Sequence, residues 1–232
     1  MLLILKRGGI IFIVLVLILC MLLFSIREET ASTNAADSVI IIDAGHGAPD
    51  GGAVGKSGVL EKDLNLAVAK LLEQKISESG QKVIMTRTED KGLYKTEEGS
   101  LRDKKREDMK ARASIANTMG ASCFVSIHMN HFTDQKYSGP QVFYAANAEG
   151  SQALAEEIRL SFLHEIGPHC TREIKPVSKD LYLLRNAKNP AVIVECGFLS
   201  NPTEEALLQK EEYQAQIANA IFVGIQNFIK AE

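Results

Sequence analysis

The chain has 232 residues, of which 46% are hydrophobic, and its 26 basic and 29 acidic side chains give a formal net charge of −3. This length and composition predict one ordinary folded domain with some additional chain, and they exclude disordered, collagen-like and disulfide-scaffold proteins. Beyond Ile26 the chain carries 24 cations and 29 anions, a balance that argues against a broad nucleic-acid-binding surface.

The N-terminal segment is the most apolar part of the sequence. The 19 residues 8–26 contain no charged side chain, and Lys6 and Arg7 precede them. A helix of this length spans about 28 Å, close to the roughly 30 Å core of a bilayer. We therefore expect an uncleaved signal anchor over 1–26, followed by a polar tether over 27–37. The alternative is a cleaved signal peptide, although the apolar run is longer than such peptides usually have. The two basic residues are expected to stay in the cytoplasm, which places the rest of the chain outside.

The remainder of the chain, residues 38–232, alternates short apolar runs with helical patterns. The predicted strands are Val39–Ile42, Val83–Met85, Cys123–Ile127, Val142–Tyr144, Leu181–Leu184 and Val192–Val194. The predicted helices are 61–79, 109–119, 151–166 and 211–230, and the charged stretch 89–108 is predicted to be a loop. Strands separated by helices indicate an α/β fold. We expect a single domain with a mainly parallel, twisted sheet of about six strands flanked by helices, preceded by one N-terminal transmembrane helix.

Two glycine-rich segments look like nucleotide-binding loops but lack the required spacing. Residues 52–57 end like a P-loop, yet Asp50 stands where the first glycine of that motif belongs, and its charge would repel a phosphate. Asp50 also occupies the position of the third glycine in a dinucleotide fingerprint that would begin at Gly45. The sequence therefore predicts no nucleotide ligand.

Residues that could bind a metal stand at the ends of three predicted strands. His46 lies between two glycines after the first strand, His128 follows the third, and Glu195 follows the last. Glu61 begins the first long helix. Because ligand sites in parallel sheets lie outside the carboxyl ends of the strands, these side chains can share one site. Two imidazoles and one carboxylate suit a catalytic Zn²⁺ with an open position. On its own, each residue could instead have a structural role. Each histidine could be a hydrogen-bonded structural residue, Glu61 could be favoured by the helix dipole, and Glu195 could be a buried carboxylate beside an arginine.

Four motifs occur in unbroken order over residues 38–230. They begin at Ile42, Glu61, Ser126 and Val194 and read IDAGHGAPDGGA, EKDLNL, SIHMN and VECGFLSN. Together they resemble the zinc-dependent N-acetylmuramoyl-L-alanine amidases, the amidase-3 family. The resemblance implies that 38–232 is a catalytic domain in which His46, Glu61 and His128 bind one Zn²⁺ per chain. It implies that Glu195 is the catalytic carboxylate, and Arg112 matches a further family motif.

The resemblance also implies an activity and a place of action. The activity is hydrolysis of the amide bond between the lactyl group of N-acetylmuramic acid and the L-alanine of the stem peptide in peptidoglycan. In its single N-terminal anchor and compact size, the chain resembles the sporulation subgroup of the family. This resemblance implies a germination-related action on spore cortex, as the first step toward muramic-δ-lactam. The expected location is the outer face of the cytoplasmic membrane, in the cell wall or the forespore intermembrane space. The expected partners are peptidoglycan, the membrane through the N-terminal helix, and a regulatory protein, with no nucleic acid.

Two other classes of function stay open on the sequence alone. A zinc peptidase acting on stem peptides would release amino acids without freeing lactyl carboxylates. A non-catalytic wall-binding or regulatory domain would be expected to have lost at least one of the candidate ligands or Glu195, and all of them are present.

Overall fold

The computed structural model describes residues 12, 14–21, 38–95, 98–178 and 181–231. The chain divides into two compact units, Met1–Asp37 and Ser38–Glu232. In the first unit, Phe12 and residues 14–21 are helical. Most of the predicted apolar anchor and all of the predicted tether lie outside the described residues. Among the residues described, no helix combines the length and the hydropathy needed to cross a membrane.

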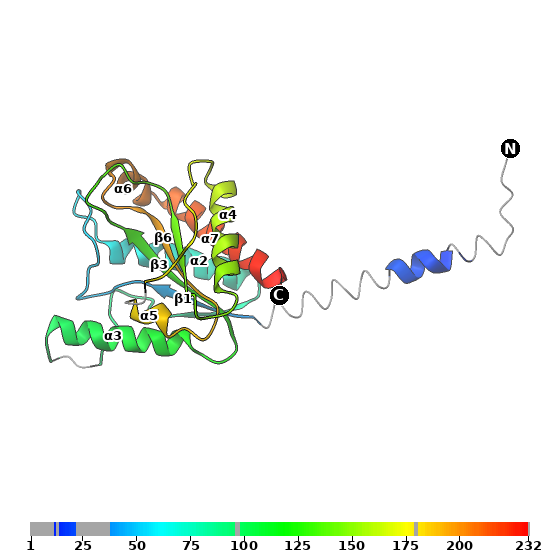
Figure 1. Ribbon diagram of the computed structural model, residues 1–232, viewed down its shortest axis with the longest axis horizontal. Coiled ribbons are helices and arrows are strands. Elements are labelled where there is room, and N and C mark those ends of the chain that lie inside the picture. Colours follow the sequence, from blue (N-terminus) through cyan, green and yellow to red (C-terminus); the bar gives the residue numbers. More distant parts are fainter. Residues whose placement is uncertain (1–11, 13, 22–37, 96–97, 179–180, 232) are drawn as a thin grey trace. The chain divides into compact units, whose positions relative to one another are not determined.

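Six strands in the described part of Ser38–Glu232 form one sheet (Figure 1). They are β1 (Val39–Ala44), β2 (Lys82–Met85), β3 (Ala121–Asn130), β4 (Gln141–Tyr144), β5 (Lys175–Pro176) and β6 (Ala191–Phe198). Their spatial order is β2-β1-β3-β6-β4-β5, and β4 runs antiparallel to β6 whereas every other neighbouring pair is parallel. The predicted single α/β domain with a mainly parallel sheet of six strands is confirmed.

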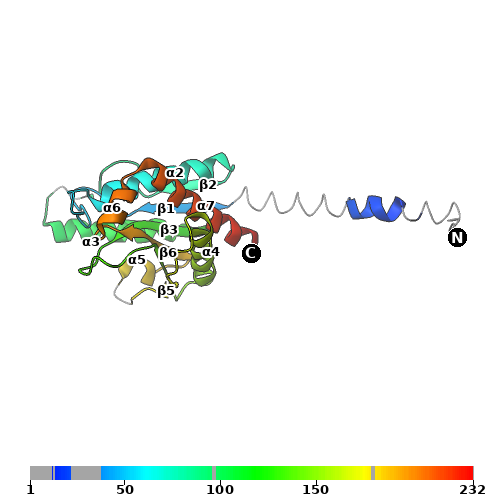
Figure 2. The same ribbon diagram turned by 90° about the horizontal axis from the view of Figure 1, so that it is seen from above.

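Helices pack against both faces of this sheet, with α3 and α5 together on one side and α4 and α7 on the other (Figures 1 and 2). The helices are α2 (Glu61–Glu78), α3 (Leu101–Ala116), α4 (Ser151–Glu165), α5 (Tyr182–Arg185), α6 (Pro202–Leu208) and α7 (Glu211–Ala231). The larger core joins α2, α4 and α7 to strand residues such as Ile40 and Val125. The smaller core joins α3 and α5 to the alternate strand residues, among them Ile41 and Phe124.

The face covered by α3 and α5 also carries polar strand residues. Because side chains alternate along a strand, Asp43 of β1 and Ser126 of β3 point to this face, and both are fully buried. His128 and Glu195 lie further along the same face and are directly paired between β3 and β6. Since β1, β3 and β6 are adjacent and parallel, their carboxyl ends bring these residues to one edge of the sheet.

The predicted loop over 89–108 is wrong in its second part, because α3 begins at Leu101. The Ser100 hydroxyl caps this helix by accepting a hydrogen bond from the Asp103 backbone N–H at 3.2 Å. The first two turns are charged because they are largely exposed, so the apolar pattern becomes visible only from Met109.

The predicted strand Leu181–Leu184 is also wrong, because Tyr182–Arg185 form the short helix α5. A run of four apolar residues does not distinguish a strand from a buried helical turn. The remaining strand of the sheet is instead β5, whose two residues are exposed and show no pattern. Helix α6 was not predicted, although Asn201 caps it and Pro202 occupies its first turn, which are ordinary start signals.

Candidate metal centre

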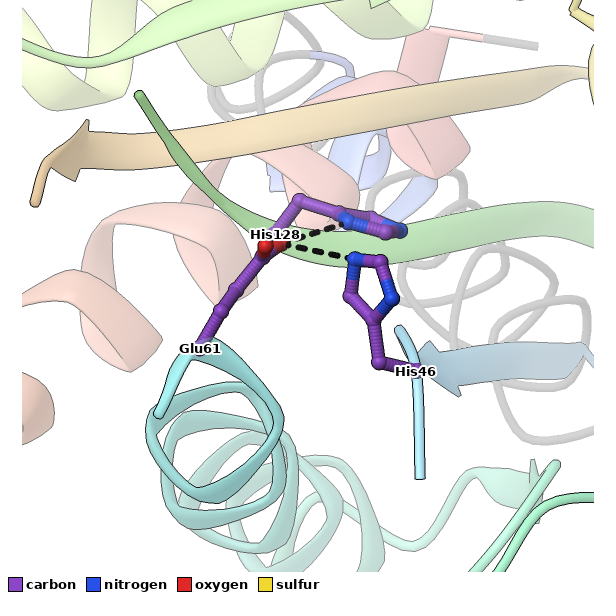
Figure 3. Close-up of side chains that lie close together, drawn as sticks. All are labelled: His46, Glu61 and His128. Carbon is purple, nitrogen blue, oxygen red and sulfur yellow. Dashed lines mark hydrogen bonds and ion pairs between the residues drawn. The ribbon is translucent and has the colours of Figure 1, made fainter. Parts of the chain in front are cut away.

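The three predicted ligands lie together at the carboxyl edge of the sheet (Figure 3). His46 comes from the loop after β1, Glu61 from the first turn of α2, and His128 from β3. Their donor atoms all lie within 4.8 Å of one another. Glu61 Oε1 is 3.2 Å from His46 Nε2 and 2.9 Å from His128 Nδ1. Residues separated by 15 and 67 positions in the sequence therefore form one cluster of two imidazoles and one carboxylate.

Backbone amides fix the Glu61 carboxylate in this cluster. The N–H of Met129 donates to Glu61 Oε1 at 3.2 Å, and the N–H of Ala53 donates to Glu61 Oε2 at 2.8 Å. Glu61 is 4% exposed. Burial raises the pKa of Glu61, but its hydrogen bonds to His128 and His46 outweigh this effect and hold the pKa well below its usual range. The cluster therefore contains an ionised carboxylate in a fixed position.

Arginine side chains hold the loop that presents His46. This histidine has a φ of 61°, a left-handed conformation that is uncommon for a residue with a side chain. Arg112 donates to the His46 carbonyl and, at 2.8 Å, to the Ala44 carbonyl, which also accepts from Arg87 Nε at 2.8 Å. A second Arg87 nitrogen donates to the Gly45 carbonyl at 3.0 Å. Three consecutive carbonyls of the ligand loop are thus bound to guanidinium groups, which stabilise the strained conformation.

Two glycines leave the space that the ligands occupy. A Cβ atom at Gly45 would lie 2.3 Å from the His128 ring. A Cβ atom at Gly52 would lie 2.5 Å from Glu61 Oε2 and 2.8 Å from the His46 ring, and Gly52 also has a φ of +68°. The glycine-rich loop therefore serves the ligand cluster and not a phosphate group.

The cluster fits a divalent cation in both donor chemistry and charge. Asp50 Oδ2 lies 3.0 Å from His46 Nδ1, the ring nitrogen that does not face Glu61. Burial lowers the pKa of His46, but the hydrogen bonds and charges of Glu61 and Asp50 raise it overall. The negative groups that favour a proton on this imidazole would equally favour a metal ion. In zinc sites, the histidine nitrogen that does not bind the metal usually donates a hydrogen bond to a carboxylate or a similar acceptor. Nitrogen and carboxylate donors also suit zinc.

Glu195 stands beside the cluster but outside it. It is paired with His128 in the β3–β6 register, and its Oε2 atom is buried without a hydrogen-bond partner among the described residues. Burial raises the pKa of Glu195 to about 7, although the nearby charge of His128 acts in the opposite direction. A carboxyl group with a pKa near neutrality and a free oxygen is suited to accept and return a proton.

A cavity of about 270 Å³ opens at the ligand cluster, and His46, His128 and Glu195 line one part of it. The cavity extends along α3, which contributes Leu101, Lys104, Lys105, Asp108, Met109 and Arg112 to its wall. These positions recur at three- and four-residue spacing and form one face of the helix. The cavity therefore lies between residues of the sheet and one face of α3.

The supporting roles of several residues around the site were not predicted from the sequence. Asp43 accepts hydrogen bonds from Thr86 Oγ1 at 2.7 Å and from Ser126, and it pairs with Arg112 beneath the ligand loop. The sequence pattern around Asp50 indicates only that this residue excludes a P-loop and a dinucleotide fingerprint. The signal that could have identified Asp43 and Ser126 is a polar residue on the same face of two otherwise apolar strands.

Comparisons with known proteins show which family the chain is similar to. A family profile described as N-acetylmuramoyl-L-alanine amidase matches residues 40–227. The germination-specific N-acetylmuramoyl-L-alanine amidase of Bacillus subtilis is 37% identical over 201 residues, covering 85% of this chain and 82% of the relative. The structure of the CwlD amidase from Clostridioides difficile in complex with the GerS lipoprotein is similar, with a TM-score of 0.81 and 42% identity, covering 84% of this chain and 100% of that one. The N-acetylmuramoyl-L-alanine amidase from Clostridium difficile 630 has a TM-score of 0.73 and 30% identity, covering 85% and 99%.

Proposed function

Because the chain belongs to the amidase-3 family of N-acetylmuramoyl-L-alanine amidases, we propose that it hydrolyses the amide bond between the lactyl group of N-acetylmuramic acid and the L-alanine of the stem peptide. The observation that carries this proposal is the placement of Glu195, with an unpartnered carboxylate oxygen, in the same cavity as His46 and His128 of the ligand cluster. A metal site and a proton-accepting carboxylate on one cavity are the two parts that metal-assisted amide hydrolysis uses.

In this proposal His46, Glu61 and His128 hold one Zn²⁺. Bound zinc supplies Lewis-acid chemistry, which polarises the scissile carbonyl and makes water a nucleophile at neutral pH. Glu61 provides the negative charge of the ligand set, and Asp50 orients the His46 ring through its outer nitrogen.

Glu195 moves the proton in this scheme. Its carboxylate takes a proton from the attacking water as the water oxygen bonds to the amide carbon. It then gives that proton to the alanine nitrogen as the carbon–nitrogen bond breaks, so the products are a lactyl carboxylate and a peptide with a free amine. The position of Glu195 within β6 fixes the carboxylate relative to His128 on the neighbouring strand.

The chemical identity of the products tests this function. We expect digestion of peptidoglycan by the purified protein to release stem peptides whose new amino group belongs to L-alanine, and mass spectrometry of the fragments identifies that group. Release of D-alanine or of cross-link fragments alone would instead show a zinc peptidase. An unchanged digest would indicate a non-catalytic wall-binding or regulatory domain.

The finer assignment rests on two relatives. We propose action on spore cortex as the first step toward muramic-δ-lactam, since a relative at 37% identity is a germination-specific amidase. We also propose a regulatory protein partner, because the similar CwlD amidase has been solved in complex with a lipoprotein.

The proposed location is the outer face of the cytoplasmic membrane, with residues 8–26 as an uncleaved anchor. Its support is the uncharged apolar run of 19 residues behind Lys6 and Arg7. We expect protease added outside protoplasts to degrade the domain, whereas a cytoplasmic control protein survives. Full protection of the domain from the same protease would contradict the orientation.

A further inference from the structure

The far end of the cavity differs chemically from the end at the ligand cluster. Tyr94, Leu101 and Leu181 line it, and the side chains of Lys104 and Lys105 lie on its α3 wall. Among the described residues that line the whole cavity there is no serine, threonine, asparagine or glutamine. A sugar chain presents many hydroxyl groups, and uncharged side chains that hydrogen-bond them are few on this wall, so the wall suits a peptide better than the glycan side of a muropeptide.

The two lysines are not equivalent. Lys105 Nζ lies 2.8 Å from Asp50 Oδ1, so its charge is already paired with the carboxylate that orients His46. Lys104 Nζ instead lies 4.8 Å from the centre of the Tyr94 ring and meets no carboxylate within the part of the chain that the structure describes. Of the other acidic residues that line the cavity, Asp43 and Asp108 are both paired with Arg112. Lys104 is therefore the cation on the cavity wall that remains available to an anion.

The segment carrying Tyr94 is fixed to α3. The backbone N–H of Leu93 donates to Asp108 Oδ1 at 2.6 Å, and the N–H of Lys95 donates to Glu107 Oε2 at 3.1 Å. Tyr94 lies between these two anchored residues, so the ring that Lys104 contacts is held in place. Lys104 and the apolar side chains around it therefore form an ordered end of the cavity.

We propose, on the basis of the proposed function, that this end of the cavity binds the stem peptide. In this proposal Lys104 forms an ion pair with a free carboxylate of that peptide. The scissile amide lies at His46, His128 and Glu195, and the peptide leaves it along α3. An acidic peptide with small side chains matches an apolar wall that carries one available cation. The enzyme should then prefer a peptide with a free carboxylate on its second residue over the same peptide carrying a carboxamide there.

The test uses two synthetic substrates, N-acetylmuramoyl-L-alanyl tripeptides with D-glutamate or D-isoglutamine as the second residue. In both, the γ-carboxyl group of the second residue is amide-linked to the same third residue. For a partly exposed ion pair, we expect wild-type kcat/KM to be about fivefold higher for the carboxylate substrate, mainly through KM. In Lys104→Gln this ratio should fall to about one. The matched control is Lys110→Gln on the same helix, because Lys110 is exposed and does not line the cavity, and it should keep the wild-type ratio.

Equal kcat/KM for both substrates in the wild-type protein, or an unchanged preference in Lys104→Gln, would overturn this assignment while the amidase function stands. Calorimetry with the Glu195→Gln variant separates the two proposals. If neither substrate is cleaved by the wild-type protein, the amidase function fails. A tighter Kd for the carboxylate peptide that disappears in the Lys104→Gln/Glu195→Gln double variant would still support the peptide site, and equal Kd values would reject it.

Discussion

Replacing Glu195 by Gln is expected to lower kcat by about 10²–10⁴-fold or more while the protein keeps its zinc. The substitution preserves the size of the side chain and removes its ability to accept a proton. Glu195 is paired in register with His128 but does not belong to the cluster of donor atoms, so the variant keeps every candidate ligand of the metal. The measurement is the rate of amine release together with zinc per chain in one preparation.

The matched control for this variant is Glu149→Gln, because Glu149 is an exposed carboxylate outside the cavity. It should keep both the rate and the metal. Loss of zinc in Glu195→Gln would make Glu195 a ligand, and retained turnover would make it a structural residue.

Replacing His46 by Ala is expected to abolish tight zinc binding, and with it turnover. Loss of a partner that only orients a ligand typically lowers metal affinity by about 10–100-fold, and loss of a ligand itself should cost more. Only Glu61 and His128 would remain in the cluster. The measurement is elemental analysis of the purified protein after dialysis against a weak chelator.

Backbone strain has to be separated from ligand loss in this experiment, since His46 has a φ of 61°. His46→Asn is the companion variant, because asparagine tolerates the left-handed region better than alanine does. Both variants should lose the metal, and His131→Ala, which changes an exposed histidine just after β3, should retain it. Normal zinc content in His46→Ala would refute the ligand assignment.

The clustering of the three candidate ligands could be predicted because each stands near the carboxyl edge of the sheet. His46 follows the apolar strand β1, His128 lies near the end of β3, and Glu61 is the first residue of a helix with an apolar stripe. In a parallel sheet the carboxyl ends of neighbouring strands meet, so distant residues converge without any sequence spacing that shows it. The positions of the strand ends therefore indicate where much of the candidate site lies.

The rest depends on contacts that have no local pattern. The role of Asp50 depends on the conformation of the glycine-rich loop, which turns its carboxylate toward His46. Arg87 supports the ligand loop by donating hydrogen bonds to backbone carbonyls. Because every residue has a carbonyl group, the sequence does not show which carbonyls a side chain will bind. The start of α3 was hidden because its first turns are exposed and charged, although the lysines in those turns line the cavity.

The most direct test of a zinc amidase built on His46, Glu61 and His128 is a zinc titration of metal-free protein. Cleavage of the muramoyl–L-alanine amide in a synthetic muropeptide is followed as free amine. The rate should rise in proportion to added zinc and reach a plateau at one zinc per chain. Full cleavage by the chelator-treated protein before any zinc is added would contradict the account.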